Sequence, residues 1–345
     1  MANVVAGLAI VSGLLAGMVS AVAQEADSES LFQWESSKPL LMARDVDGWP
    51  WHSVKDPTIV RHDRLWHLFT TVRGSDRSHA IMYTAFADWD QANKAPRRIL
   101  PMHSGYFCAP QVFWFEPHQC WYLICQASDE SWGEKPFRPA FATTTELSNP
   151  DSWSKLTPMF RERPANIPGW IDFWVICDDQ SAWLFFTANN GQMWRCQTSL
   201  QDFPLGWSTP VLALQDRLFE ASHTYRIRGR DQYLTVVEEQ NGYGFRYYKA
   251  WLADRLDGEW RPLAATKDQS FASLKNVVLP AGAHWTDSIS HGELLRAGTD
   301  QRMEIDPDHL QFLYQGATNA EKAGRSYGEI PWQLGLLKLQ GKSPL

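Results

Sequence analysis

The sequence predicts an all-β fold, a five-bladed β-propeller, and three observations lead to this prediction. A unit of two short apolar strands joined by a polar turn recurs five times along the 345 residues. Markers at the start of successive units lie 54, 62, 48 and 71 residues apart, which suits blades of three or four strands. Apolar residues at the i, i+3, i+4, i+7 spacing of an amphipathic helix are nearly absent.

The strand units follow one another in a regular order. The first is "KDPTIVRHDRLWHLFTT", and the five units span 55–71, 109–126, 171–188, 219–238 and 289–316. A further strand-like run follows each unit, at 79–89, 139–147, 192–200, 244–252 and 332–340. The segment "LFQWES" (31–36) is expected to add a strand to the last blade and close the ring.

Each unit opens with a polar or small residue in front of a run that should be buried. In a propeller the inner strand of each blade lines the central axis, and equivalent strand ends face the same rim. We therefore expect Asp56, Asp172 and Glu220 to share one pocket floor, with His291 beside them. The five opening residues are Asp56, Pro110, Asp172, Glu220 and His291.

Converging carboxyl groups suit either hard-metal binding or glycoside hydrolysis. A glycosidase needs an acid for the leaving oxygen and a base or nucleophile opposite, and a third carboxylate can raise the pKa of the acid. The positive charge of Lys55 would favour ionised Asp56. A single acid before a strand is usually a turn or cap residue, and Asp56-Pro57 is a common turn signal. Recurrence in three units favours a functional site.

The amino-acid composition favours some classes of function and argues against others. The chain holds 18 tryptophans and 13% aromatic residues, and a surplus of indole rings at a surface would suit sugar rings. The net charge of −7 and the lack of a long basic run argue against nucleic-acid binding. All five cysteines lack metal-site spacing, and four lie in apolar runs, so we expect them to be buried as small hydrophobic residues.

The N-terminal segment has the pattern of a secretory signal peptide. Residues 1–23 contain an uncharged apolar stretch that ends in Ala21-Val22-Ala23, an A-x-A cleavage motif. The alternative is a membrane anchor. Because the stretch is rich in Ala and Gly and has no basic flank, cleavage before Gln24 is favoured. We therefore expect a secreted, extracellular protein with one catalytic domain at 24–345, no membrane partner and a monomeric state.

Six motifs occur in a recognisable order. They are "VKDPTIV", "GWIDFWVI", "LFEASHTY", "ATKDQSFA", "WTDSISHGELLR" and "LQFLYQG". With these motifs the chain resembles the α-L-arabinofuranosidases of glycoside hydrolase family 62, from about Phe32 to Leu339. The resemblance implies a five-bladed propeller that removes single arabinofuranosyl side groups from arabinoxylan, and also from arabinan, with inversion.

The resemblance also implies roles for individual residues. Asp56 is similar to the general base, Glu220 to the general acid, and Asp172 to the residue that orients the sugar and tunes the pKa of the acid. His291 is similar to the ligand of a structural Ca²⁺ whose other ligands are largely water. The substrate-binding positions implied are Lys55, Tyr314, Gln315 and Tyr327. The family's usual Tyr-Asn pair is here Tyr327-Gly328.

Three other functions remain open on the sequence. Two are related five-bladed glycosidases, a β-xylosidase and an arabinanase. The third is a non-catalytic sugar-binding propeller, which would have no need for an acid and a base on opposite sides of one pocket.

Overall fold

The computed structural model describes Met1 and residues 30–345, with the exception of 77, 134–135 and 242–244. The predicted signal peptide therefore lies, apart from Met1, outside the described residues. No helix in the described part of the chain is long and apolar enough to cross a membrane.

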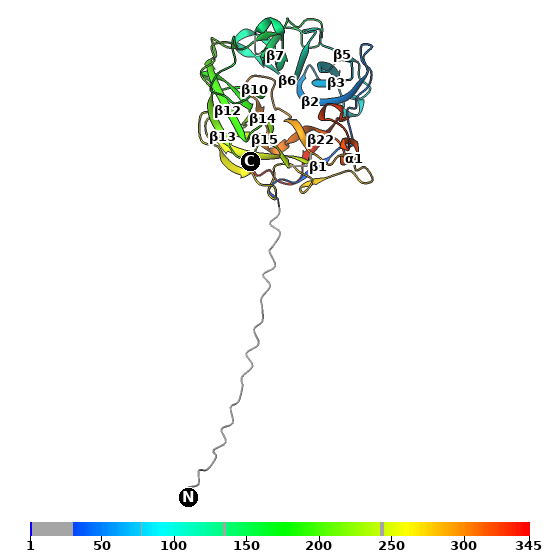
Figure 1. Ribbon diagram of the computed structural model, residues 1–345, viewed down its shortest axis with the longest axis vertical. Coiled ribbons are helices and arrows are strands. Elements are labelled where there is room, and N and C mark those ends of the chain that lie inside the picture. The colour runs from blue at the N-terminus through cyan, green and yellow to red at the C-terminus, as the bar shows by residue number, and fades with distance from the viewer. Residues whose placement is uncertain (2–29, 77, 134–135, 242–244) are drawn as a thin grey trace.

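Five β-sheets form a ring around a central axis (Figure 1). Three blades contain four strands each, and we number the blades in chain order. Blade I consists of β2 (Trp51–His62), β3 (Leu65–Gly74), β4 (Ala80–Phe86) and β5 (Arg97–Ile99). Blade II consists of β6 (Tyr106–Phe115), β7 (Cys120–Ser128), β8 (Phe137–Thr144) and β9 (Thr157–Pro158). Blade III consists of β10 (Ile171–Cys177), β11 (Ser181–Thr187), β12 (Gln192–Ser199) and β13 (Val211–Gln215).

The last two blades contain five strands each. Blade IV consists of β14 (Glu220–Ile227), β15 (Tyr233–Asn241), β16 (Phe245–Ala253), β17 (Arg261–Ala264) and β20 (Glu304–Ile305). Blade V consists of β19 (Ser290–Leu294), β21 (Gln311–Gly316), β22 (Gln333–Leu339), β1 (Trp34–Ser36) and β18 (Val277–Val278). The five-bladed propeller is therefore confirmed.

Among the residues that the structure describes, helical structure is confined to short turns. The α-helix α1 spans Asn319–Lys322, and Thr318 caps it. The 3-10 turns are η1 (Trp89–Gln91), η2 (Glu116–His118), η3 (Glu130–Trp132), η4 (Pro307–His309) and η5 (Tyr327–Glu329).

The N-terminal strand closes the ring. β1 pairs antiparallel with β22, with Trp34 opposite Leu339 and Ser36 opposite Leu337. The sequence expectation for 31–36 is thus confirmed. The start of the chain thus becomes a strand of the last blade and closes the ring. Its hydrogen bonds to β22 satisfy backbone N–H and C=O groups that an open strand edge would leave unpaired.

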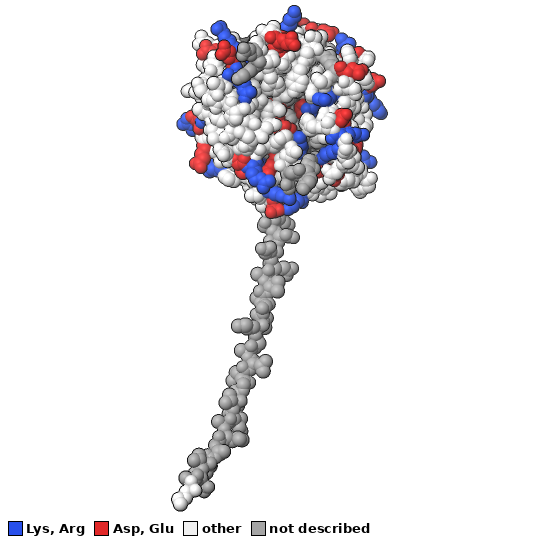
Figure 2. All heavy atoms as spheres, in the orientation of Figure 1, with Lys and Arg blue, Asp and Glu red and all other residues white. Residues whose placement is uncertain are grey.

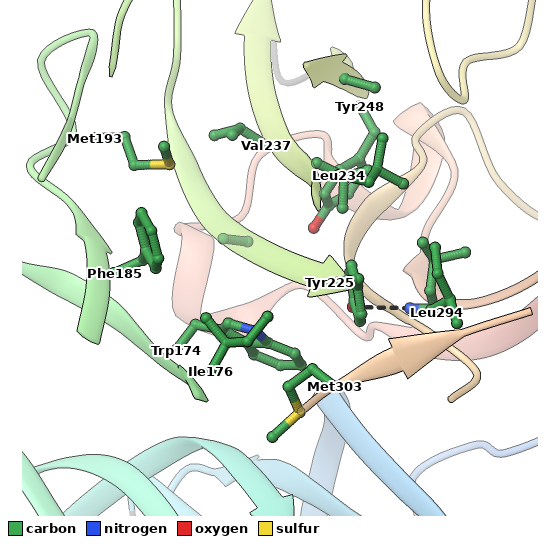
Figure 3. Close-up of a cluster of buried hydrophobic side chains, with 14 of the residues drawn as sticks. Trp174, Ile176, Phe185, Met193, Tyr225, Leu234, Val237, Tyr248, Leu294 and Met303 are labelled. Atoms are coloured by element: carbon green, nitrogen blue, oxygen red, sulfur yellow. Dashed lines mark hydrogen bonds between the residues drawn. The ribbon is translucent and has the colours of Figure 1, made fainter. Parts of the chain in front are cut away.

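Buried side chains of neighbouring blades interlock between the sheets (Figure 3). Trp174 of β10 donates its indole N–H to the carbonyl of Thr224 in β14, at 2.8 Å. The backbone N–H of Leu294 donates to the hydroxyl oxygen of Tyr225, at 3.0 Å. These bonds cross blade boundaries, so packing and polar contacts together fix how the blades sit around the axis.

The cysteines behave as the sequence predicts. All five are free, and four are buried while Cys120 is half-buried. Cys108 differs from a purely apolar group, because its thiol donates to the Tyr106 hydroxyl oxygen and accepts from Gln126 Nε2, both at 3.1 Å.

Candidate active site

A bulge in each inner strand turns side chains toward the axis. Pairing slips by one residue between Lys55 and Thr58 in β2, and equivalent slips occur in β6, β10, β14 and β19. Asp56 and Asp172 lie in these bulges with φ of 49° and 54°. Aspartate tolerates this left-handed region better than most residues do, and bulges re-aim side chains near active sites.

The third acid stands one residue earlier than the other two. In blade IV the bulge residue with positive φ is Ala221 (53°), and in blade II it is Ala109 (50°). Glu220 therefore precedes its bulge, whereas Asp56 and Asp172 occupy theirs. The longer glutamate side chain extends from a position that is displaced along the strand, so the three acids do not share one register as the sequence comparison assumed.

Asp56 is a buried carboxylate with two charged or polar neighbours. Its Oδ2 lies 3.1 Å from Lys55 Nζ, and its Oδ1 lies 3.3 Å from His291 Nδ1. Its backbone N–H donates to Gln315 Oε1 at 2.8 Å. Burial raises the pKa of Asp56, but the Lys55 charge, His291 and a bond from Thr71 outweigh burial and lower it to about 2. Asp56 is therefore ionised near neutral pH.

Asp172 lies between Asp56 and Glu220. Its Oδ2 accepts the backbone N–H of Ala221 at 3.0 Å and lies 3.8 Å from the same His291 Nδ1 that faces Asp56. Its own backbone N–H donates to Gln126 Oε1 at 3.1 Å. Burial, followed by the charges of Glu220 and Asp56, raises the pKa of Asp172 well above its usual range. The repulsion among the acids that the sequence suggested is present, and it acts on Asp172.

Glu220 shares a guanidinium group with a second, fully buried glutamate. Arg246 NH1 lies 2.6 Å from Glu220 Oε1 and 2.8 Å from Glu238 Oε1. Glu238 also accepts the backbone N–H of His291 at 2.7 Å. Burial, opposed by Arg246 and reinforced by Glu220, raises the pKa of Glu238 to about 7. The cluster therefore binds a proton close to neutral pH.

The ring of Tyr327, in η5, lies over the two cations beside the acids, Lys55 and Arg246. Its ring centroid lies 5.3 Å from Lys55 Nζ and 4.9 Å from the guanidinium carbon of Arg246. The side chain is still 43% exposed, so its outer part faces solvent above the acids. At the next position, a Cβ on Gly328 would collide with the guanidinium of Arg73, so Arg73 occupies the space that a side chain would need there.

Three of the four predicted substrate-binding residues lie in this cluster. Lys55 contacts Asp56, Gln315 accepts the Asp56 backbone N–H, and Tyr327 covers Lys55. Tyr314 does not lie in this cluster. Its buried hydroxyl lies 2.8 Å from Ser36 Oγ, because successive residues of β21 point to opposite faces and Gln315 takes the face toward the axis.

His291 is the one predicted metal ligand. The residues described contain no group of three or more His, Cys, Asp or Glu side chains that could hold a metal ion. A hard cation such as Ca²⁺ prefers six to eight oxygen ligands, so His291 could supply one ligand and water would have to supply most of the others. The residues present thus fit a largely hydrated ion and no all-protein cage.

Sequence reasoning missed Arg246 and Glu238. Each lies inside an apolar strand run, Glu238 in "TVVEEQ" and Arg246 in "FRYYKAW". Charges in such runs need a partner or a task, the same signal that singled out Asp56. Applied to the outer strands of each unit, that rule would have found both residues.

The geometry offers three carboxyl groups of different character in one polar recess. One is firmly ionised, one has a raised pKa, and one is held by an arginine. Away from this recess both signs of charge are interspersed over the visible face of the molecule (Figure 2). This combination suits acid–base chemistry on an uncharged substrate such as a sugar.

Over most of its length the chain is similar to known glycoside hydrolases. Residues 33–338 match the family model described as "Glycosyl hydrolase family 62". The chain is 38% identical over 325 residues to "Alpha-L-arabinofuranosidase C" of Cellvibrio japonicus (strain Ueda107), covering 92% of this chain. It spans about half of that relative's length, 48%.

Solved structures show the same similarity. The catalytic domain of a GH62 α-L-arabinofuranosidase from Coprinopsis cinerea is 37% identical with a TM-score of 0.82, covering 90% of this chain and 97% of that one. A GH62 hydrolase in complex with xylotriose is 35% identical with a TM-score of 0.80, covering 90% of this chain and 98% of that one.

Proposed function

The chain belongs to glycosyl hydrolase family 62, and from this premise we propose that it is an exo-acting α-L-arabinofuranosidase. The observation that carries the proposal is the meeting of Asp56, Asp172 and Glu220 around His291 and Ala221, in a chain of that family. Its substrate is arabinoxylan, from which it removes arabinofuranosyl side groups with inversion, and arabinan is a second possible substrate.

Asp56 acts as the general base in this proposal. With a pKa of about 2 it is ionised and can accept a proton from water. Lys55 and the backbone bond to Gln315 hold the carboxylate in place. The activated water then attacks the anomeric carbon from the side opposite the leaving oxygen, which inverts the configuration.

Glu220 acts as the general acid that protonates the leaving oxygen. Arg246 holds its carboxyl in one position, and Glu238 shares that arginine. Beside Glu220 the pKa of Glu238 is raised to about 7, and burial with the charges of Glu220 and Asp56 raises the pKa of Asp172. Asp172 orients the sugar between acid and base and adds like-charge repulsion that keeps a proton in the cluster.

Several further features belong to the same proposal. Residues 1–23 act as a secretory signal, so the enzyme works outside the cell. It acts on polysaccharide as a monomer. A structural Ca²⁺ with His291 as its protein ligand would stiffen the pocket floor and add positive charge below the acids. No step of the reaction proposed above runs through this ion. The xylotriose in the complex named above supports a xylan-type partner.

A substrate panel tests the function. Wild-type protein is incubated with wheat arabinoxylan, arabinan, and the 4-nitrophenyl glycosides of α-L-arabinofuranose and β-D-xylose, and released sugars are identified by chromatography. We expect free arabinose from arabinoxylan and from the aryl arabinofuranoside. Release of xylose alone would favour a β-xylosidase, and release of arabinan oligomers an arabinanase. Binding to arabinoxylan without any release would favour a sugar-binding protein.

A further inference from the structure

An open groove lies on the rim of blade I, outside the pocket of acids. Its cavity volume is about 870 Å³, which is larger than one sugar unit needs. The loop before β2, the β3–β4 turn and the segment from β5 to β6 contribute to it. We call it the Trp49 groove, and the lining residues used below are Asp47, Trp49, Asp76, Arg98, His103 and Ser104.

Trp49 is the unusual residue of this groove. All 18 tryptophans lie in the described part of the chain. Trp49 is the most exposed of them, with 41% of its surface accessible to solvent. Its backbone is fixed, because its N–H donates to the Val46 carbonyl at 3.0 Å and its carbonyl accepts the Val46 N–H at 3.2 Å. Single exposed apolar side chains are common. A large indole held on a rigid turn at the edge of a groove is a ready platform for a flat apolar face.

Polar groups surround the indole. Arg98 lies 3.2 Å from Asp47 and 3.5 Å from Asp151, while the side chain of Arg98 remains 52% exposed. Asp47 also accepts the backbone N–H of Ile99 at 2.8 Å. The guanidinium is therefore positioned by carboxylates and still reachable, and guanidinium, carboxylate and hydroxyl groups are the partners that sugar hydroxyls use.

The loop that carries Trp49 is bonded to the turn that carries Tyr327. Three residues after Trp49, His52 Nε2 lies 2.8 Å from the carbonyl oxygen of Gly328. Gly328 follows Tyr327, whose ring covers Lys55. Trp49 and Tyr327, the two exposed aromatic side chains on this side, are thus linked by one short path across His52.

A second set of contacts connects the groove to the acids below the surface. Asp76 belongs to the β3–β4 turn, from which His79 packs its ring edge on Tyr106 at 4.8 Å. Gln126 donates to the Tyr106 hydroxyl oxygen at 3.1 Å and accepts the Asp172 backbone N–H at 3.1 Å. These contacts connect the β3–β4 turn, which lines the groove, with the inner strand that carries Asp172.

From these observations we infer that the Trp49 groove binds pyranose units of the polysaccharide main chain, remote from the linkage that is cleaved. The C–H face of a pyranose would stack on Trp49, and its hydroxyls would meet Arg98 and the carboxylates of Asp47 and Asp76. This inference rests on the proposed function, because that function supplies a polysaccharide as the substrate. A small aryl glycoside has no polysaccharide main chain for the groove to bind.

Trp49→Ala tests the inference, with Trp49→Phe as the conservative variant. Binding is measured without turnover, by the retardation of each protein in native gels that contain unsubstituted xylan. Hydrolysis is measured on arabinoxylan and on 4-nitrophenyl α-L-arabinofuranoside. Leu205→Ala is the matched control, because Leu205 is 50% exposed and lies in blade III. Since Trp49 is exposed, all variants should fold, and thermal melting curves check this.

The loss of one stacking contact predicts about two- to tenfold weaker retardation and a KM for arabinoxylan raised by a similar factor in Trp49→Ala. Activity on the aryl glycoside should be unchanged, Trp49→Phe should recover much of the binding, and Leu205→Ala should equal wild type. Unchanged retardation and KM in Trp49→Ala, equal losses on both substrates, or no retardation of wild type would overturn the inference. If retardation depends on Trp49 but no arabinose is released, xylan binding in the Trp49 groove would be supported. Only the proposed arabinofuranosidase function would then be refuted.

Discussion

Two clusters of buried charge lie along the same inner strands, and their difference separates function from stability. The upper cluster contains the acids at the bulges. The lower cluster lies three residues further along β2 and β6, where Arg296 NH2 donates to the carbonyls of Ile59 and Val112 at 3.0 and 2.8 Å. Its Nε also pairs with Glu293 at 2.9 Å.

The lower cluster is balanced, and the upper one is not. Below, one cation faces one acid, and the arginine connects blades I, II and V. Above, four carboxyl groups share two cations, since burial lowers the pKa of His291 and disfavours its charge. Like charges kept close together raise pKa values and cost stability. A fold keeps such an arrangement where the chemistry needs it.

Removing an acid of the upper cluster should have the largest effect. Asp56→Ala and Glu220→Ala should each lower kcat/KM on arabinoxylan by on the order of 10²–10⁴-fold or more, because general base or acid help is lost. Asp231→Ala, which changes an exposed carboxylate in blade IV, serves as control. Near wild-type turnover in either variant would refute the role assigned to that residue.

Breaking the lower cluster should lower the free energy of unfolding and leave the catalytic activity of the folded protein unchanged. Arg296→Met leaves Glu293 buried without its cation, which should lower the free energy of unfolding by about 3–5 kcal/mol. Denaturant titration measures this change, and activity per folded molecule should stay close to wild type. A loss of activity in fully folded Arg296→Met would mean that the two clusters are not separate in function.

Lys55→Met should change the pH profile. The pKa of Asp56 in the folded protein, about 2, lies below its ordinary value, so the Lys55–Asp56 pair stabilises the protein above about pH 4 and is lost as the pH falls through about 2. Removing the cation raises that pKa, and the acidic limb of kcat/KM should move to higher pH by on the order of one to three pH units. An unmoved limb would exclude Asp56 as the group that sets it.

Surface pairs give the smallest expected effect. Arg261 pairs with Asp254 through two hydrogen bonds of 2.7 and 2.8 Å, but both side chains are about half exposed. Arg261→Ala should change the melting temperature far less than Arg296→Met does, because exposed pairs contribute little. A change as large as that of Arg296→Met would remove the contrast between exposed and axial charges.

The sequence predicted the propeller because strand pairs repeat with little helical signal, and it predicted strand β1 as the closing strand. It also brought Asp56, Asp172, Glu220 and His291 to one place, since equivalent strand ends meet at the axis. It could not predict the offset of Glu220, because the bulge of blade IV falls on Ala221. Bulge position depends on pairing with the neighbouring strand, which one strand's residues do not reveal.

The charged residues that reach the acids from outer strands could not be identified from the sequence argument either. Arg246 reaches the acids from β16, the third strand of its blade, and Glu238 does so from β15. The placement of Tyr314 away from the acids was also beyond the sequence argument, because the face of β21 that meets the axis is set by its pairing with β19. These contacts depend on register, and a shift of one residue reverses the face.

Stereochemistry at the anomeric carbon decides whether Asp56 and Glu220 act as base and acid in a single displacement. Proton NMR of wild-type protein acting on arabinoxylan, recorded before mutarotation, reports which anomer is released first. We expect β-L-arabinofuranose, the product of one attack by the water that Asp56 activates. If the α-anomer came first, that single displacement could not be the reaction at this site.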